Sequence, residues 1–284
     1  MKRRDFLKAI TTGIIVGGIA PSKVLADIIK VHPITTAENY DDHIKDYLDK
    51  MHNFNKPHGG DVCLDRKKFQ ILKSSLKRLK RLQRTVGYGN FYLLGFDDAI
   101  SVASNYSRVG PFSRAELDFL EMIFYEDGAL YGFFGEKPLK NLTYRVKKQE
   151  VVKVPNNGNY IFKGQPVETY KKIKKDIGDQ VSLTSGVRSV IKQFMLFLNK
   201  TYKSNGNLSM ASRSLAPPGY SFHGIGDFDV GQSGFGVANF TERFTTTDVF
   251  KRLEALGYVN LRYPKNNHLG VRFEPWHIKV FPNA

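Results

Sequence analysis

The chain has 284 residues, of which 41% are apolar and 13% aromatic, and its formal net charge at pH 7 is +16. This composition excludes a chain that is disordered throughout, and it is sufficient for a large folded core. The positive charge indicates an anionic partner or surface, such as nucleic acid, phospholipid or an acidic cell-wall polymer, without distinguishing them. Cys63 is the single cysteine, which excludes an internal disulfide.

The N-terminus has the features of an export signal. Residues 3–8, RRDFLK, resemble the R-R-x-F-L-K segment of twin-arginine signals, and a Gly-rich apolar stretch too short to span a bilayer follows. Val24 and Ala26 supply the small residues that a signal peptidase needs, so we expect cleavage after Ala26. Residues 1–26 are therefore predicted to be a twin-arginine signal peptide, with an ordinary N-terminal helix or an uncleaved anchor as the alternatives. The mature protein is expected to be periplasmic or extracellular, which argues against nucleic acid as its partner.

Residues 27–139 are predicted to form a helical N-terminal region, whose role the sequence does not assign. Apolar residues follow one helix face at 38–54 and again at 66–84. The second helix contains nine Lys and Arg and no acidic residue. Its basic face either contacts an anionic glycan, lipid or partner, or is simply a solvated face of a packed helix. Ser113 and Glu116 predict a capping box at the start of a third helix.

Residues 140–284 mix helices and short strands without regular alternation. This pattern predicts an α+β fold in which a small antiparallel sheet is flanked by helices, behind the helical N-terminal extension. The expected elements are two strands within 150–163 joined by an Asn-Asn-Gly turn, helices at 189–202 and at 248–256 after an N-cap at Thr247, and strands at 258–263 and 270–281.

Polar residues able to do chemistry cluster at three places late in the chain. Two histidines and a carboxylate that leave a fourth position open are typical of catalytic zinc, and a further carboxylate can act as general base. Taken singly, each residue has an ordinary structural explanation: a hydrogen-bonded His, a turn-forming Asp or a surface ion pair. The three groups are Ser185, Arg188, Ser189 and Gln193; Ser221, His223, Asp227 and Asp229; and Glu274 with His277.

Three segments resemble bacterial zinc D-alanyl-D-alanine carboxypeptidases of the VanY-like group. "SGVRSVIKQ" is similar to their S-G-x-R-S-x-x-x-Q segment, "SFHGIGDFD" is similar to their S-x-H-x-x-G-x-A-x-D element, and "EPWH" matches their E-x-W-H element. The motifs occur in the family's order, and the resemblance covers roughly residues 140–284, which are predicted to form the catalytic domain. Residues 27–139 lie outside it.

The resemblance implies a role for several residues. His223 and His277 would be zinc ligands, and Glu274 would be the general base. Arg188, together with Gln193 and Ser221, would bind the terminal carboxylate of the substrate, a task that suits the fork of a guanidinium.

The third zinc ligand departs from the family pattern. That pattern places six residues between the ligand His and the ligand Asp. In this sequence the position reached by that spacing from His223 is Val230, whereas Asp229 is separated from His223 by five residues. Strand alternation puts Phe228 and Val230 on the core face and both aspartates on the polar face. We therefore expect Asp229 to be the ligand, with Asp227 as the alternative or as a residue that orients a ligand histidine.

The implied function is that of an exported zinc metallopeptidase that acts on peptidoglycan stem peptides. A carboxypeptidase that removes a C-terminal D-alanine, D,D or L,D, is the first expectation. A D,D-endopeptidase or dipeptidase is the alternative within this class, and a catalytically inactive cell-wall-binding protein is the alternative of another class. The expected cofactor is Zn²⁺, and the expected partners are stem peptides and an anionic cell-wall or membrane surface.

Overall fold

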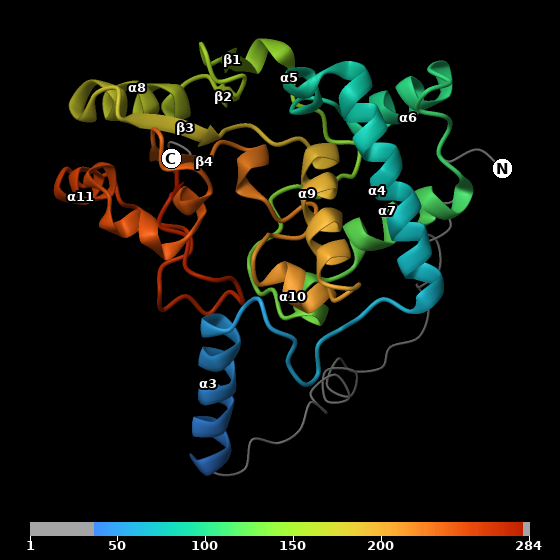
Figure 1. Ribbon diagram of the computed structural model, residues 1–284, viewed down its shortest axis with the longest axis horizontal. Helices are drawn as coiled ribbons and strands as arrows, with labels where there is room; N and C mark the ends of the chain where they lie inside the picture. Colours follow the sequence, from blue (N-terminus) through green and yellow to red (C-terminus); the bar gives the residue numbers. More distant parts are fainter. Residues whose placement is uncertain (1–36, 281–284) are drawn as a thin grey trace, which may run out of the picture. The chain divides into compact units, whose positions relative to one another are not determined.

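The structure, a computed structural model, describes residues 37–280 (Figure 1). The predicted signal peptide at 1–26 lies outside the described residues. The chain divides into two units, Met1–Asp46 and Tyr47–Ala284, and helix α3 (Ala37–His52) begins in the first and ends in the second. Within the described part, no helix is both long and apolar enough to cross a membrane.

The second unit combines helices with two small antiparallel sheets, which confirms the predicted α+β class. Its helices are α4 (Arg66–Val86), α5 (Tyr88–Phe91), α6 (Phe96–Asn105), α7 (Arg114–Tyr125), α8 (Gln165–Ile177), α9 (Val190–Lys203), α10 (Leu208–Ser212) and α11 (Asp248–Ala255). Short 3-10 helices are η1 (Gly128–Tyr131), η2 (Lys148–Glu150), η3 (Phe222–Gly224), η4 (Gly236–Phe240) and η5 (Glu242–Thr246). The strands are β1 (Val151–Lys153), β2 (Tyr160–Phe162), β3 (Val181–Ser185), β4 (Phe228–Gln232) and β5 (His277–Ile278).

Side-chain caps fix the starts of the main helices. The capping box of α7 is present, with Ser113 and Glu116 each bonded to the backbone of the other. Ser189 caps α9 by accepting a hydrogen bond from the backbone of Lys192, and Thr247 caps α11 as predicted. Because an N-cap satisfies a backbone N–H that has no partner within the helix, these residues define where each helix begins.

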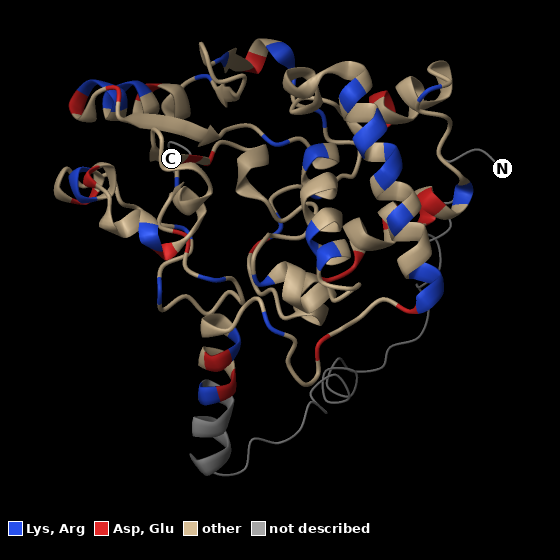
Figure 2. Cartoon of the chain, in the orientation of Figure 1, with Lys and Arg blue, Asp and Glu red and all other residues tan. Residues whose placement is uncertain are grey.

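Helix α4 separates its apolar and basic residues onto different faces. The predicted stripe of Leu72, Leu76, Leu79 and Leu82 is buried, and most of its Lys and Arg residues are exposed. Figure 2 shows blue segments along both α4 and α9. Burial of the leucine stripe is enough to account for the position of α4 in the fold. Contact of its basic face with an anionic partner therefore stays a prediction.

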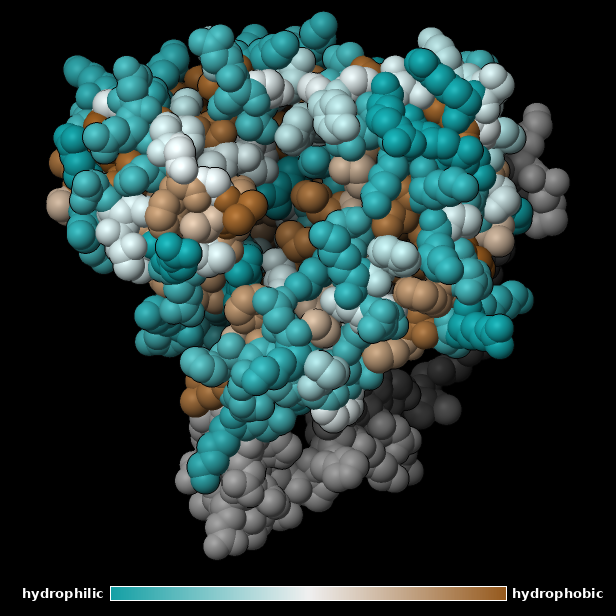
Figure 3. All heavy atoms as spheres, viewed as in Figure 1, coloured by the Kyte–Doolittle hydropathy of each residue, from teal (hydrophilic) through white to brown (hydrophobic). Residues whose placement is uncertain are grey.

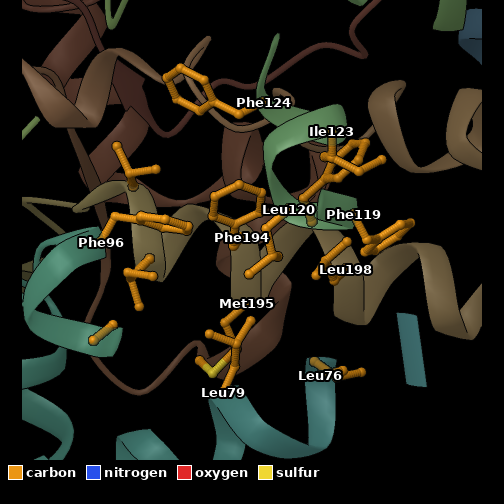
Figure 4. Close-up of a cluster of buried hydrophobic side chains, with 14 of the residues drawn as sticks. Leu76, Leu79, Phe96, Phe119, Leu120, Ile123, Phe124, Phe194, Met195 and Leu198 are labelled. Atoms are coloured by element: carbon orange, nitrogen blue, oxygen red, sulfur yellow. The ribbon is translucent and has the colours of Figure 1, made fainter. Parts of the chain in front are cut away.

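The largest hydrophobic core joins residues from both predicted regions of the chain. Leu79 of α4 and Phe119 of α7 lie in one buried cluster with Phe194 and Leu198 of α9 (Figure 4). Each fully buried side chain of this kind contributes about 1.5–3 kcal/mol. Residues on either side of position 140 therefore share a core, and the proposed domain limits themselves stay a prediction.

The three-stranded sheet places the polar residues of interest next to one another. Its order is β3-β4-β5, all antiparallel, and Asp229 is paired with Ser185 on one side and with His277 on the other. Phe228 and Val230 are fully buried in a second core. Strand alternation therefore divides β4 as predicted, with its aspartates on the face opposite that core.

Two predicted strands near the C-terminus are wrong in extent. Residues 258–263 contribute only an isolated bridge between Leu261 and Ile278, and the segment 270–281 contributes only β5. Pro275 cannot continue a ladder because it lacks an N–H, and the backbone N–H of His277 turns back across it to the carbonyl of Glu274 at 3.2 Å. The predicted strands at 150–163 are confirmed as β1 and β2.

A buried ion pair ties the loop after α3 to the rest of the second unit. Arg213 donates from Nη1 to Oδ1 of Asp61 at 2.7 Å and from Nη2 to the other oxygen at 3.0 Å. The amide of Asn207 also donates to Asp61 at 2.7 Å. Burial raises the pKa of Asp61, but these bonds, one from the backbone of His58 and the charge of Arg213 outweigh it and lower the pKa to about 2.

We expect Asp61→Asn to lower the free energy of unfolding at pH 7 by about 3 kcal/mol, because it leaves Arg213 buried without its counter-ion. The folded-state pKa of Asp61 is below the unfolded value, so its contribution is complete above pH 4 and is lost as the pH falls toward 2. Urea unfolding at several pH values should therefore show the difference between wild type and variant shrinking in acid. Asp118→Asn, which removes an exposed pair with Arg114, is the control and should change stability by less than about 0.5 kcal/mol. Equal stability of wild type and Asp61→Asn at pH 7 would contradict this account.

Candidate metal centre

Three buried side chains converge from different elements of the second unit. His223 comes from η3, Asp229 from β4 and His277 from β5, and one ligand atom of each lies within 4.8 Å of the others. Oδ1 of Asp229 is 3.2 Å from Nε2 of His223 and also 3.2 Å from Nδ1 of His277. Two ligands bound at about 2.1 Å in a tetrahedral zinc site are roughly 3.4 Å apart. The spacing therefore fits a single zinc ion.

The hydrogen bonding of these atoms also fits a site for a cation. Nε2 of His223 and Oδ1 of Asp229 are buried and have no hydrogen-bond partner. Buried polar atoms without a partner are rare in native proteins because desolvating them is costly. A metal ion between the three side chains would satisfy both atoms, so the residues present fit the group.

The remaining nitrogen of each histidine is held by an acceptor. Nδ1 of His223 lies 2.8 Å from the carbonyl of Gly186, and Nε2 of His277 lies 2.9 Å from Oδ2 of Asp227. Contacts of this kind fix the tautomer and the ring orientation of metal-binding histidines. A side chain at Gly186 would place its Cβ 1.9 Å from the carbonyl oxygen of Tyr160, so only glycine allows this backbone approach.

The carboxylate of Asp227 already has hydrogen-bond partners, and it contacts His277 at Nε2, the nitrogen that does not face Asp229. Besides the imidazole, its carboxylate accepts hydrogen bonds from the guanidinium of Arg262 and, at 2.9 Å, from the backbone of Val280. The two aspartates on this face of β4 thus have different surroundings: Asp229 faces both histidines at the convergence point, and Asp227 orients one of them from behind.

The electrostatics favour the metal-binding protonation state of His223 and Asp229, whereas His277 holds a proton that a metal would displace. Burial and the charge of Arg188 lower the pKa of His223 to about 4, so its ring is neutral at pH 7. Burial alone would raise the pKa of Asp229, but the adjacent imidazole of His223 and the charge of Arg188 hold it well below its usual range. Burial lowers the pKa of His277, but the hydrogen bond to Asp227 and the nearby carboxylate of Asp229 raise it to about 9. A cation at Nδ1 of His277 would take the place of that proton.

Glu274 lies beside the cluster, on the wall of a cavity of about 410 Å³ that Asp229 and Arg188 also line. Its Oε2 is 3.8 Å from Nδ1 of His277, because the turn at Pro275 brings both side chains to the same side, as predicted. Burial raises the pKa of Glu274, which suits a residue that must both accept and release a proton near neutral pH. The face seen in Figure 3 is hollowed near its middle, where apolar side chains show.

Of the three residues expected to bind substrate, only Arg188 is among those that line this cavity. Its Nη2 donates to Oδ2 of Asp229 at 2.5 Å and its Nε donates to Ser185 at 2.8 Å. Gln193 is buried and donates to the carbonyl of Ala216 at 2.5 Å, with its own oxygen unpaired. Ser221 is also buried, in the turn that precedes His223.

The sequence analysis did not single out the other charged residues of the cavity. They are Lys192, Lys200 and Arg272, and the cavity is also lined by Phe54, Asn55 and Tyr92 from the N-terminal region. A signal was present for the lysines, since positions 188, 192, 196 and 200 recur every four residues and so follow one face of a helix. The contribution of residues 54–55 depends on the loop held by Arg213, and no local pattern predicts it.

Residues 165–283 match a protein-family model described as VanY, D-alanyl-D-alanine carboxypeptidase. Among curated proteins, none matches the chain. Similar solved structures include a vancomycin resistance D,D-pentapeptidase VanY from a VanB-type resistance cassette in complex with Zn(II), which is 23% identical, with a TM-score of 0.38, over 52% of this chain and 86% of that one. The LdcB LD-carboxypeptidase is 25% identical, with a TM-score of 0.36, over 51% of this chain and 65% of its own. VanYB in complex with D-alanine-D-alanine is 23% identical, with a TM-score of 0.39, over 52% and 83% of the two chains.

Proposed function

We propose that this chain is a zinc-dependent carboxypeptidase that removes a C-terminal D-alanine from peptidoglycan stem peptides, and that its residues 165–283, which match the VanY D-alanyl-D-alanine carboxypeptidase model, form the catalytic part. The observation that carries the proposal is the buried cluster of His223, Asp229 and His277, two of whose ligand atoms have no other partner. Glu274 stands beside this cluster on the wall of an open cavity.

The metal-binding cluster and Glu274 would have different roles in hydrolysis. Zinc held by the His–Asp–His cluster would supply Lewis-acid chemistry that activates water and the scissile carbonyl at neutral pH. Glu274 would accept a proton from the attacking water and later donate it to the leaving amine. Its raised pKa brings these two roles closer to balance at neutral pH than an ordinary carboxyl could.

Arg188 would bind the terminal carboxylate of the substrate. Its Nε and Nη2 are held by Ser185 and Asp229, which fixes the plane of the guanidinium at the cavity wall. A fixed guanidinium can meet a carboxylate with little further loss of side-chain freedom. This contact favours an enzyme that acts at a free C-terminus.

We expect Arg188→Lys to lower kcat/KM for a peptide with a free C-terminal carboxylate about 10- to 100-fold, because a charge-assisted hydrogen bond contributes about 1.5–3 kcal/mol. The same peptide with a C-terminal carboxamide should be hydrolysed equally by variant and wild type. Steady-state kinetics on this peptide pair, with zinc content measured in both proteins, tests the role. An equal loss on both peptides would mean that Arg188 acts only through Asp229.

The activity itself is tested by incubating the zinc-loaded protein with tetrapeptide, pentapeptide and cross-linked muropeptides and analysing the products by mass. Release of D-alanine from the pentapeptide supports a D,D-carboxypeptidase, and release from the tetrapeptide supports an L,D-carboxypeptidase. Cleavage of the cross-link alone, or release of a dipeptide, would support the endopeptidase or dipeptidase alternative. Unchanged substrates in the presence of zinc would contradict the enzymatic proposal.

We also propose that the protein acts outside the cytoplasm, after export directed by residues 1–26. The residues that support this proposal are RRDFLK at 3–8, and the substrate class agrees with it. The exposed Lys and Arg of α4 would face anionic cell-wall or membrane surfaces, and nucleic acid is not an expected partner. A reporter fused to residues 1–26, with Arg3 and Arg4 replaced by lysine in the control, tests the export route.

A further inference from the structure

The cavity beside the candidate metal centre is unbalanced in charge. Its two carboxylates, Asp229 and Glu274, are both assigned to the reaction above. The same cavity is lined by four cationic side chains, those of Arg188, Lys192, Lys200 and Arg272. Among the described residues, Lys192, Lys200 and Arg272 form no ion pair within 4.0 Å, although the more distant carboxylates of Glu274 and Asp229 act on the charge of Arg272.

Two of these cations occupy one part of the cavity, together with the loop after α3. The guanidinium of Arg272 lies 4.8 Å from the ring centres of both Phe54 and Trp276. Lys200 donates to the side-chain oxygen of Asn55, the neighbour of Phe54. Lys192 belongs with Arg188 instead, because its ammonium lies over the ring of Tyr92 and the charge of Arg188 acts on it.

Arg272 has contacts on several sides but no described carboxylate bonded to its guanidinium. Its backbone N–H donates to the carbonyl of Arg213 at 2.9 Å, and Arg213 in turn anchors the loop through Asp61. Aromatic contacts on two sides fix the plane of the guanidinium, and its Nε is buried without a hydrogen-bond partner. A buried donor without a partner, at the wall of an open cavity, is what a ligand's acceptor would satisfy.

Lys200 and Arg272 are close enough to oppose each other. Burial lowers the pKa of Lys200, and the charge of Arg272 lowers it further. Holding two like charges together without a counter-ion destabilises the protein unless an anion binds between them. Lys200 is eight residues after Lys192 on α9, which places it about 12 Å farther along the helix axis. A bound peptide in extended conformation covers this distance with three to four residues.

We propose that Lys200 and Arg272 form a second carboxylate site, and that the preferred substrate is therefore an acidic stem peptide whose side-chain carboxylates are free rather than amidated. This inference rests on the proposed function, because it assumes that a peptide lies in the cavity with its terminal carboxylate at Arg188. Free carboxylates of this kind are those of glutamate and diaminopimelate side chains. An amidated stem peptide would leave both cations unpaired.

The test is isothermal titration calorimetry with the zinc-loaded Glu274→Gln protein, so that binding is measured without turnover. The ligands are two synthetic pentapeptides of the same sequence, one with free side-chain carboxylates and one with each of them converted to the carboxamide. We expect the acidic peptide to bind at least about tenfold more tightly, as a charge-assisted contact implies. Adding Lys200→Gln should abolish this preference, and adding Lys203→Gln, which removes an exposed lysine of the same helix, should preserve it.

Arg272→Lys provides a second variant, which keeps the charge but loses the planar contacts with Phe54 and Trp276, and it should reduce the preference. Equal affinity for the two peptides, a preference that survives Lys200→Gln, or binding of neither peptide would overturn the proposal. These results are separable from failure of the proposed function, which is judged by mass analysis of muropeptides incubated with the wild-type enzyme. Hydrolysis of acidic and amidated substrates at equal rates would leave that function standing and remove the second carboxylate site.

Discussion

We expect Glu274→Gln to lower kcat for stem-peptide hydrolysis by about 10²- to 10⁴-fold, the usual contribution of a general acid–base residue. Glutamine has almost the same shape as glutamate but cannot take a proton from water. Burial raises the pKa of Glu274, so the base becomes protonated, and activity is lost, at a higher pH than for an ordinary carboxyl group. The acidic limb in the pH profile of wild-type kcat should therefore lie above the range in which exposed glutamates titrate.

The measurement is kcat on the best muropeptide, with zinc content and thermal unfolding recorded for the same samples. The variant should bind zinc and unfold like the wild type, because Glu274 lies beside the three ligands and is not one of them. Glu168→Gln, at an exposed position of α8, is a matched control that should change nothing. Hydrolysis by Glu274→Gln at more than a tenth of the wild-type rate would show that another group acts as the base.

His277→Ala is expected to abolish stoichiometric zinc binding and activity together, because two remaining ligands do not hold a catalytic zinc. The measurement is zinc content after dialysis, together with thermal unfolding with and without a chelator. At a free zinc concentration 1,000 times Kd, the wild type should be stabilised by about 4 kcal/mol relative to the chelated protein, and the variant should show no such difference.

Two controls separate a ligand from its neighbours. His268→Ala removes an exposed histidine and should leave zinc binding unchanged. Asp227→Asn keeps all three ligands but weakens the contact that orients His277, so zinc affinity should fall about 10- to 100-fold without being lost. Complete loss of zinc in Asp227→Asn, with retention in an Asp229→Asn variant, would reverse the roles assigned to the two aspartates.

Local sequence signals were sufficient wherever neighbouring residues determine the structure. The predicted caps at Ser113 and Thr247 begin helices, because each satisfies a backbone donor within its own turn. Alternation along β4 placed Phe228 in the core, and with it both aspartates on the opposite face. The three side chains that converge at the candidate metal centre come from motifs up to 54 residues apart in the chain. They could be named in advance because the resemblance to a family implied that these motifs lie close together in space.

The elements and contacts that the sequence did not predict depend on packing between residues far apart in the chain. Helix α8 and strand β3 were not expected, although Pro166 in the first turn and Gly178 after the last turn mark the ends of α8. Strands were expected at 258–263, where an isolated bridge is all that forms, because the pairing depends on a partner that is itself two residues long. The contact of Phe54 with Arg272 joins residues more than 200 positions apart and leaves no local pattern.

The central claim is that His223, Asp229 and His277 bind one zinc ion at the reaction centre. Anomalous diffraction at the zinc absorption edge, from crystals of the mature protein grown with one equivalent of zinc, tests it most directly. The account predicts one strong peak within about 2.0–2.2 Å of Nε2 of His223, Oδ1 of Asp229 and Nδ1 of His277. A peak coordinated by Asp227 in place of Asp229, or stoichiometric zinc bound elsewhere, would contradict it.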